Sequence, residues 1–194
     1  MSREFEILKS YNLKTGSSFM RPAQVLLEQV NLSDSALAVM TDLSKVSLVV
    51  ARPNAAMDSA NAKMIRYGVR MLLVLDSNDH LAGLLTANDI LGEKPMRFLQ
   101  NMGGTHADIM VRDLMTPQRE LEVMNIEDVK TAEVGQIVAT LKKSGRQHGL
   151  VVADGADGKQ TVCGIFSVTQ IARQLGLNVT QMLAEIDAVV TKSN

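Results

Sequence analysis

Two short polar patterns at matching places in the chain contain side chains that could bind a ligand or take part in a reaction. In the first pattern, the hydroxyl residue Thr86 stands three positions before the acid Asp89. In the second, Ser167 stands three positions before the amide Gln170. At the start of a helix such a pattern predicts a capping box, in which both side chains bind backbone N–H groups. The same geometry offers a helix N-terminus to a phosphate and two carboxylate oxygens to the hydroxyls of a ribose. Capping is the simpler interpretation, and ligand contact remains the alternative.

Other combinations of reactive side chains give little support for catalysis. The histidines His80, His106 and His148 are scattered, and Cys163 stands alone among apolar neighbours. Neither a metal cluster nor a nucleophile with its base is visible in this arrangement. Residues 154–159 resemble a calcium loop but have an alanine at a ligand position and no closing Glu, so they predict a hairpin turn. The sequence therefore indicates a protein that is not an enzyme and holds no metal.

The two polar patterns occupy corresponding places in an internal duplication. One copy opens at Met40 and Thr41, and the other opens 75 positions later at Met115 and Thr116. A period of this size indicates two copies of one supersecondary unit that bury faces against each other. The duplication also predicts two related clefts, whose differences should follow the differences between the copies.

Each copy predicts the order strand-helix-strand-strand-helix. The first helices are expected after the N-caps Asn54 and Thr131, and each ends 14 positions later at a glycine, Gly68 or Gly145. The last helices should begin at Thr86 and Ser167. Strands are expected at residues 46–50, 71–75, 121–124 and 150–153. Turns are expected at residues 76–79 and 154–159. We therefore expect an α/β fold in which helices and strands form separate layers.

The segments outside the copies complete the predicted organisation. We divide the chain into an N-terminal extension (1–35), a first repeat (36–95), a connecting segment (96–110), a second repeat (111–178) and a C-terminal helix (179–194). A helix-like stretch is expected at residues 23–30, and Pro95 is expected to end one helix before another at 96–102. The last helix carries an apolar stripe of Leu183, Ile186, Val189 and Val190. This stripe predicts either packing within the chain or a dimer contact.

Composition narrows the class of protein. The 194 residues are 46% hydrophobic and 21% charged with a net charge of −1, which is typical of a globular protein without an electrostatic reason to bind nucleic acid or an anionic membrane. Aromatic side chains that could stack on nucleic acid bases are few. The apolar run at residues 71–75 is far too short to cross a membrane, and the first residues lack a signal-peptide pattern. With one cysteine and no disulfide framework, we expect a cytoplasmic protein.

The ordered pair of openings and closings resembles a CBS domain pair, also called a Bateman module. The openings are Met-Thr at 40–41 and 115–116, and the closings are Gly-Leu-Leu-Thr-Ala-Asn-Asp-Ile at 83–90 and Gly-Ile-Phe-Ser-Val-Thr-Gln-Ile at 164–171. The resemblance covers about residues 36–178. It implies two repeats packed sheet to sheet about a pseudo-twofold axis, with clefts that hold adenine nucleotides or related adenosyl ligands. It also implies flat homodimers that sense a ligand and regulate a partner protein.

For the first cleft, the resemblance assigns ligand contacts to Thr86 and Asp89, with Asp89 on the ribose. The second copy has Ser167 at the hydroxyl position but departs from the family pattern at Gln170, where an acid is expected. Exchanging a charged acceptor for a neutral one costs about 1 kcal/mol, or roughly fivefold in affinity. We therefore expect the cleft of Thr86 and Asp89 to bind more strongly.

Further contacts follow from the same resemblance. Family members often place phosphate contacts just before the second strand, where this chain has Arg70 in one copy and Arg146 and His148 in the other. Such cations also complement the C-terminal end of a helix, and we favour that role for Arg146 while keeping Arg70 and His148 as candidate contacts. Because aromatic residues are scarce, an adenine ring would stack on aliphatic side chains such as Val46 and Leu121.

These expectations lead to one principal hypothesis and two alternatives. The principal hypothesis is a stand-alone regulatory module that binds AMP, ADP, ATP or S-adenosylmethionine in a cleft between the repeats and signals to an unidentified partner protein. It forms a homodimer, has no catalytic cofactor, and binds neither nucleic acid nor membrane. The first alternative is a constitutive dimerisation or scaffold module with empty clefts, in which Asp89 only caps its helix. The second, weaker one is an enzyme that uses the N-terminal extension, for which no chemical group is evident.

Overall fold

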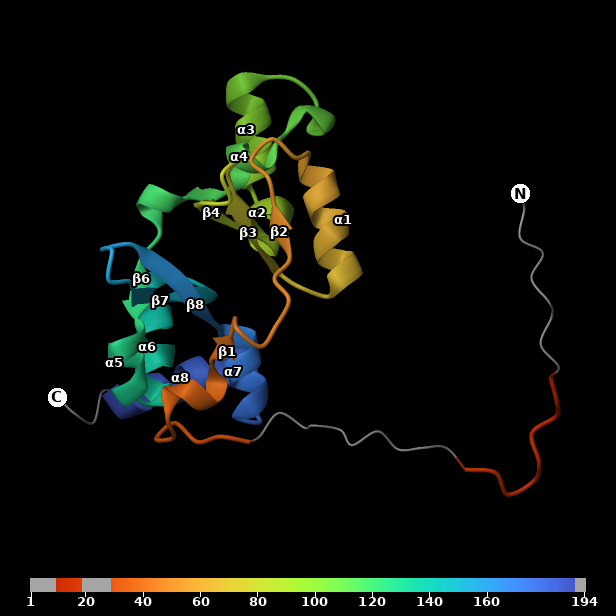
Figure 1. The fold of residues 1–194 in the computed structure, drawn as a ribbon, viewed down its shortest axis with the longest axis vertical. Helices are drawn as coiled ribbons and strands as arrows, with labels where there is room; N and C mark the ends of the chain where they lie inside the picture. Colours follow the sequence, from red (N-terminus) through yellow and green to blue (C-terminus); the bar gives the residue numbers. More distant parts are fainter. Residues whose placement is uncertain (1–9, 19–28, 191–194) are drawn as a thin grey trace.

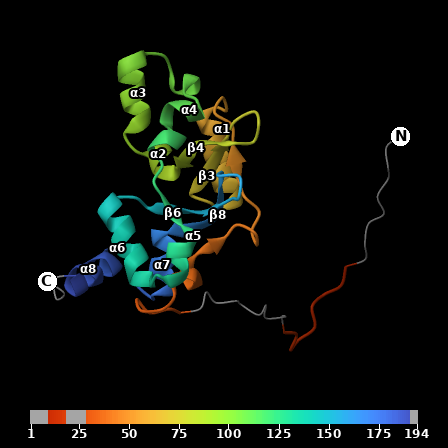
Figure 2. The same ribbon diagram turned by 60° about the vertical axis from the view of Figure 1, so that its left-hand side comes forward.

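The structure is a computed structural model that describes residues 10–18 and 29–190. The helix predicted at residues 23–30 lies outside this range except for its last two positions, which are not helical. Figures 1 and 2 show two α/β halves, with most of the first repeat above and most of the second below. Within the described residues, no helix has the length and apolar character needed to cross a membrane.

Two four-stranded sheets form the centre of the molecule. The first has the order β2 (Val50–Ala51), β3 (Met71–Leu75), β4 (Leu81–Thr86) and β5 (Thr116–Pro117), and the second has the order β1 (Thr41–Asp42), β8 (Gln160–Ser167), β7 (His148–Asp154) and β6 (Val123–Asn125). The pairs β2–β3 and β6–β7 are parallel, and the remaining pairs are antiparallel. Each repeat thus builds the same strand order around its own hairpin.

The helices follow the duplication as well. The first repeat and the connecting segment contain α1 (Met57–Tyr67), α2 (Ala87–Leu91) and α3 (Lys94–Met102), and the second repeat and the C-terminal region contain α4 (Val111–Leu114), α5 (Ile126–Thr131), α6 (Val134–Ser144), α7 (Val168–Gln174) and α8 (Val179–Val190). Short 3-10 helices occupy Ala36–Val39, His106–Asp108 and Gln118–Glu120. The described residues thus form a mixed α/β fold with two sheets, which is the predicted fold class.

The repeats exchange their first strands, which the sequence did not lead us to expect. Strand β1 opens the first repeat but pairs with β8 of the second, and β5 opens the second repeat but pairs with β4 of the first. In Figure 1, β1 accordingly lies beside β8 in the lower half. The close approach at this crossing explains the glycine in each closing pattern, because a Cβ at Gly83 would stand 2.5 Å from the Thr116 carbonyl oxygen. At the equivalent crossing, a Cβ at Gly164 would meet the Met40 side chain.

The two sheets face each other through an apolar layer. Leu73 and Leu84 from the first sheet pack with Leu150 and Ile165 from the second, and all four are buried. A larger apolar cluster lies between each sheet and the helices that cover it. The cluster of the first sheet surrounds Met57, and that of the second surrounds the fully buried Phe166. Burying three apolar layers in one chain fixes the two repeats against each other.

Some predicted boundaries need correction, although their spacing holds. The helices α1 and α6 begin after Ala56 and Glu133, two positions beyond the predicted caps Asn54 and Thr131, so the offset of 77 is preserved. Thr131 instead ends α5, a helix that only the second repeat has. The C-terminal prediction is confirmed, because each helix ends at a glycine in the left-handed conformation, with φ of 64° at Gly68 and 65° at Gly145.

The helices around Pro95 and at the C-terminus also differ from prediction. Pro95 stands in the first turn of α3, where its missing N–H is not needed, whereas α2 has already ended at Gly92. In α8 the buried Ile186 and the partly buried Leu183 pack into the core of the second repeat, so packing within the chain is the role seen for them. The side chains of Val189 and Val190 lie outside those that the structure describes.

Candidate functional site

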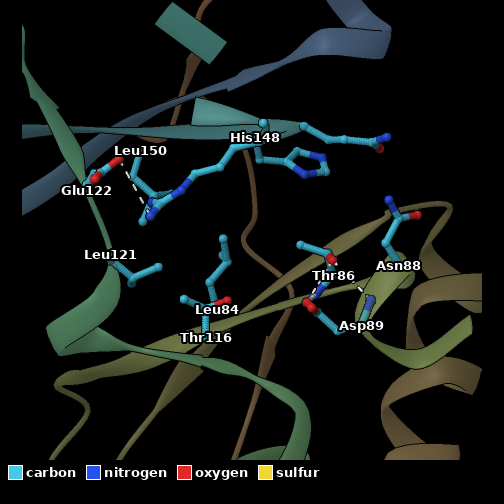
Figure 3. Close-up of a pocket in the computed structure, with 12 residues that line it drawn as sticks. Leu84, Thr86, Asn88, Asp89, Thr116, Leu121, Glu122, His148 and Leu150 are labelled. Carbon is cyan, nitrogen blue, oxygen red and sulfur yellow. Dashed lines mark hydrogen bonds and ion pairs between the residues drawn. The ribbon is translucent and has the colours of Figure 1, made fainter. Parts of the chain in front are cut away.

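A cavity of about 220 Å³ opens between the two repeats. Its walls come from the end of β4, the start of α2, strand β5, the segment before β6, and the turn from α6 into β7 (Figure 3). The lining residues are Leu84, Thr86, Asn88, Asp89, Thr116, Leu121, Glu122, Gly145, Arg146, Gln147, His148 and Leu150. Four of the predicted site residues, Thr86, Asp89, Leu121 and His148, therefore meet at one place. The last helix of one repeat faces the helix-to-strand turn of the other.

Thr86 and Asp89 form the predicted capping box. The backbone N–H and the hydroxyl of Thr86 both donate to Asp89 Oδ2 at 2.7 Å, and the Asp89 N–H donates to Thr86 Oγ1 at 3.3 Å. Both residues also line the cavity, as Figure 3 shows. Capping and ligand contact are therefore compatible here, because the box fixes the carboxylate at the cavity wall.

Lys94 is a residue of this site that the sequence analysis missed. Its ammonium lies 2.6 Å from Asp89 Oδ1 and also donates to the Leu114 carbonyl at 2.9 Å. The Asp89 side chain is 13% exposed and that of Lys94 is 47% exposed, so the pair joins a largely buried acid to a cation that water can reach. No sequence pattern indicates this pair, because α2 ends between its two members.

His148 lines the cavity and carries one ring nitrogen without a hydrogen-bond partner. Its Nδ1 atom is buried and has no hydrogen-bond partner. Burial lowers the pKa of the imidazole, the nearby charge of Arg70 lowers it further, and Asp89 opposes the shift. The ring is therefore neutral at neutral pH, and its unsatisfied nitrogen can donate to or accept from a bound molecule.

Arg146 lines the cavity, although the sequence analysis favoured a purely structural role for it. Its guanidinium donates to the Glu120 carbonyl at 3.0 Å and lies 3.6 Å from a carboxylate oxygen of Glu122. The left-handed turn at Gly145 directs the following residues back towards the cavity. Its position after that glycine is the signal that could have identified it.

The other four predicted site residues, Arg70, Val46, Ser167 and Gln170, do not line this cavity. Val46 and Arg70 belong to the first copy, whereas Ser167 and Gln170 belong to the second copy, where they match Thr86 and Asp89 of the first. The expected first strand does not include Val46, which is exposed and precedes β2. The chain forms a bend at Val46 instead of a strand, and the Val46 side chain lies in solvent.

The capping box predicted at Ser167 and Gln170 is wrong. Ser167 precedes α7 but makes no capping bond through its side chain. Instead, Gln170 accepts from the Thr41 hydroxyl at 3.3 Å and donates to Gln174 Oε1 at 3.5 Å, and Gln174 donates to the Ala38 carbonyl at 3.1 Å. The amide of Gln170 is thus turned towards the segment around the exchanged strand β1 and away from the start of its own helix.

The cavity combines groups suited to non-covalent recognition. Leu84, Leu121 and Leu150 provide apolar surface, while Asp89 accepts and Arg146 donates hydrogen bonds. Burial raises the pKa of the Cys163 thiol, which donates to the Val151 carbonyl at 3.6 Å rather than facing this cavity. Among the described residues, no cluster of three or more His, Cys, Asp or Glu side chains could hold a metal ion.

Comparison with known proteins identifies the fold. Residues 37–95 match the family model of the CBS domain. No curated protein matches the chain. An uncharacterized conserved protein from Pyrococcus horikoshii is similar in structure, with a TM-score of 0.53 and 22% identity over 74% of this chain and 93% of its own.

Two further solved structures show the same likeness. CBSX2 in complex with AMP has a TM-score of 0.50 and 24% identity, and the match covers 72% of this chain and 93% of CBSX2. A putative signal-transduction protein with CBS domains from Burkholderia ambifaria has a TM-score of 0.50 and 19% identity over 66% of this chain and 82% of its own. Residues 37–95 therefore match a CBS domain, and the two repeats together have a fold like that of these CBS-domain proteins.

Proposed function

We propose that this chain is a regulatory module that binds an adenosine-containing ligand in the cavity between its repeats and signals the occupancy to a partner protein. The observation that carries the proposal is the cavity itself, which sets the capping box of Thr86 and Asp89 opposite the unpartnered nitrogen of His148. The likeness to CBSX2, which was solved with AMP, supports this choice of ligand class. The proposal involves binding and assigns no catalytic step.

The groups of the cavity match the parts of an adenosine phosphate. The apolar wall of Leu121 and Leu150 suits a purine ring, and the Asp89 carboxylate suits the ribose hydroxyls. Helix α2 is too short for its N-terminus to form an anion site alone. Arg146 and His148 line the same cavity and could complete the contacts to a phosphate.

A module that dimerises without a ligand is the alternative, and one observation favours it. Both oxygens of the Asp89 carboxylate already have partners, Thr86 on Oδ2 and Lys94 on Oδ1. A carboxylate satisfied within the protein needs no ligand for its stability. The two functions are separated by whether an adenosyl compound binds at all.

A thermal-shift series with AMP, ADP, ATP and S-adenosylmethionine tests the proposal. A ligand at about a hundred times its dissociation constant stabilises the folded state by roughly 2.7 kcal/mol, which corresponds to a rise of roughly 5–10 °C in Tm for a chain of this length. Uridine phosphates at the same concentrations serve as controls for ionic effects. The absence of a shift with every adenosyl compound would exclude ligand sensing and favour the dimerisation module.

We also propose a homodimer formed through the outer face of the first repeat. The helices α1 and α2 expose Ile65, Tyr67 and Leu91 on this face. The matching face of the second repeat is occupied by α8. Light scattering of wild type and Leu91→Asp tests this: the variant should be monomeric at a concentration where wild type is dimeric, whereas an unchanged mass would place the contact elsewhere.

A further inference from the structure

The Asp89 carboxylate holds more donors than it can keep when a ribose binds. A carboxylate has about four acceptor positions. Oδ2 accepts two bonds from Thr86, both at 2.7 Å, and Oδ1 is 2.6 Å from the Lys94 ammonium. About one position on Oδ1 remains, whereas a vicinal diol brings two hydroxyl donors. A diol that binds with both hydroxyls must therefore displace a donor already present.

The donor displaced at least cost is Lys94. The Thr86 N–H begins helix α2, and without Asp89 it would lose its partner in a partly buried site. The Thr86 hydroxyl also accepts from the Asp89 N–H at 3.3 Å, so both of its bonds lie within the capping box. The Lys94 side chain is 47% exposed, and its ammonium can return to water. An ion pair whose cation is accessible to water is easier to break than one that is buried on both sides.

Releasing Lys94 from Asp89 has a second effect, because the same ammonium also holds α4 at the start of the second repeat. It donates to the carbonyl of Leu114 at 2.9 Å. Leu114 is the last residue of α4 and stands two positions before Thr116, which lines the cavity and belongs to the exchanged strand β5. One cation thus joins the acid on α2 to the chain segment that crosses from one repeat to the other.

We propose that Lys94 competes with ligand hydroxyls for Asp89 and thereby sets the preference of the cavity for a vicinal diol. When the diol displaces it, the hold of Lys94 on Leu114 weakens, so that occupancy of the cavity alters residues 111–115, where the second repeat begins. This inference rests on the proposed function, since it specifies how an adenosine-containing ligand is recognised.

Calorimetric binding of AMP and 2′,3′-dideoxy-AMP to wild type and Lys94→Met tests the competition. The readout is the ratio of the two affinities, because a general effect of the lost charge on the phosphate cancels in it. Removing the competitor should raise the preference for AMP by about three- to fivefold. The substitution should not disturb α3, since a cation at a helix N-terminus is unfavourable. Lys63→Met is the matched control, because Lys63 also donates to a backbone carbonyl, that of Val50, but lies away from the cavity lining.

Hydrogen exchange of residues 111–115 tests the coupling. In wild type, saturation with AMP should speed exchange at the Met115 N–H, which bonds to the Val111 carbonyl, to the rate of unliganded Lys94→Met. An unchanged or smaller preference for AMP in Lys94→Met overturns the inference while leaving the proposed function intact. Slower exchange on AMP binding overturns the coupling. If neither protein binds AMP, both the inference and the proposed function fail.

Discussion

The outer helical faces of the two repeats are formed by corresponding helices but differ in their exposure to solvent. Leu91 on α2 and Ala172 on α7 hold corresponding positions, yet Leu91 is 72% exposed and Ala172 is 2% exposed. The difference is α8, which packs on α6 and α7 and accepts a hydrogen bond from Lys142 at the Leu183 carbonyl. One repeat therefore completes its core with the end of its own chain, whereas the other leaves an apolar face open.

The polar contacts of Asp89 and of its counterpart Gln170 follow the same division. In the first repeat a charged chain of contacts runs from Asp89 through the half-exposed Lys94 to the Leu114 carbonyl. In the second repeat an uncharged chain runs from Gln170 through Gln174, which is 3% exposed, to the Ala38 carbonyl. An amide pair with one buried member has few other partners available, while an ion pair in contact with water can exchange its partners. The two repeats thus differ in their polar contacts as well as in their outer faces.

The sharpest test of the division is stability. Met182 of α8 is fully buried, and Met182→Ala should lower the free energy of unfolding by about 2–5 kcal/mol through lost burial and a cavity. The matched change Ile65→Ala on the open face should stay within about 0.5 kcal/mol. Urea unfolding at a concentration where the protein is monomeric measures both. Equal losses would mean that α8 does not distinguish the repeats.

The division in ligand binding is tested next. Asp89→Ala should weaken binding of an adenosyl ligand by about tenfold or more, because hydrogen bonds to a charged group are lost. Gln170→Ala should have a smaller effect, since Gln170 does not line the cavity. Titration calorimetry with the best ligand of the thermal-shift series compares them, and the Tm of each unliganded variant controls for the lost cap at Thr86. If the two variants bind alike, the assignment of the stronger site to Asp89 is wrong.

The smallest expected effect is a pH dependence that originates in the second repeat. Because the pKa of His148 is lowered in the folded protein, the unfolded chain binds more protons between that pKa and the ordinary value of about 6.5. The contribution of neutral His148 to the free energy of unfolding is therefore fully present above about pH 6.5. It decreases as the pH falls from there towards the pKa of the folded state. In chemical unfolding at several pH values, His148→Asn should flatten this dependence, with His80→Asn as an exposed control. An unaltered slope in His148→Asn would contradict the burial argument.

Much of the fold could be predicted because it depends on local chemistry. The left-handed helix ends at Gly68 and Gly145 and the capping box at Thr86 are set by residues within a few positions of each other. The cavity was only half predicted: Asp89 and His148 were identified separately, but nothing in one copy indicates that its last helix faces the other copy's turn. The Lys94 contact was missed because it depends on how the chain is directed after Gly92. The domain boundaries stay a prediction.

The exchange of β1 and β5 determines how the molecule can be divided. A fragment cut in the connecting segment would separate β5 from the hairpin of β3 and β4, and would separate β1 from the hairpin of β7 and β8. Each half would then expose an unpaired sheet edge, which invites pairing with other chains. The repeats are therefore one unit of folding although they are two units of sequence, and a single copy expressed alone would recover a complete sheet only by pairing with another molecule.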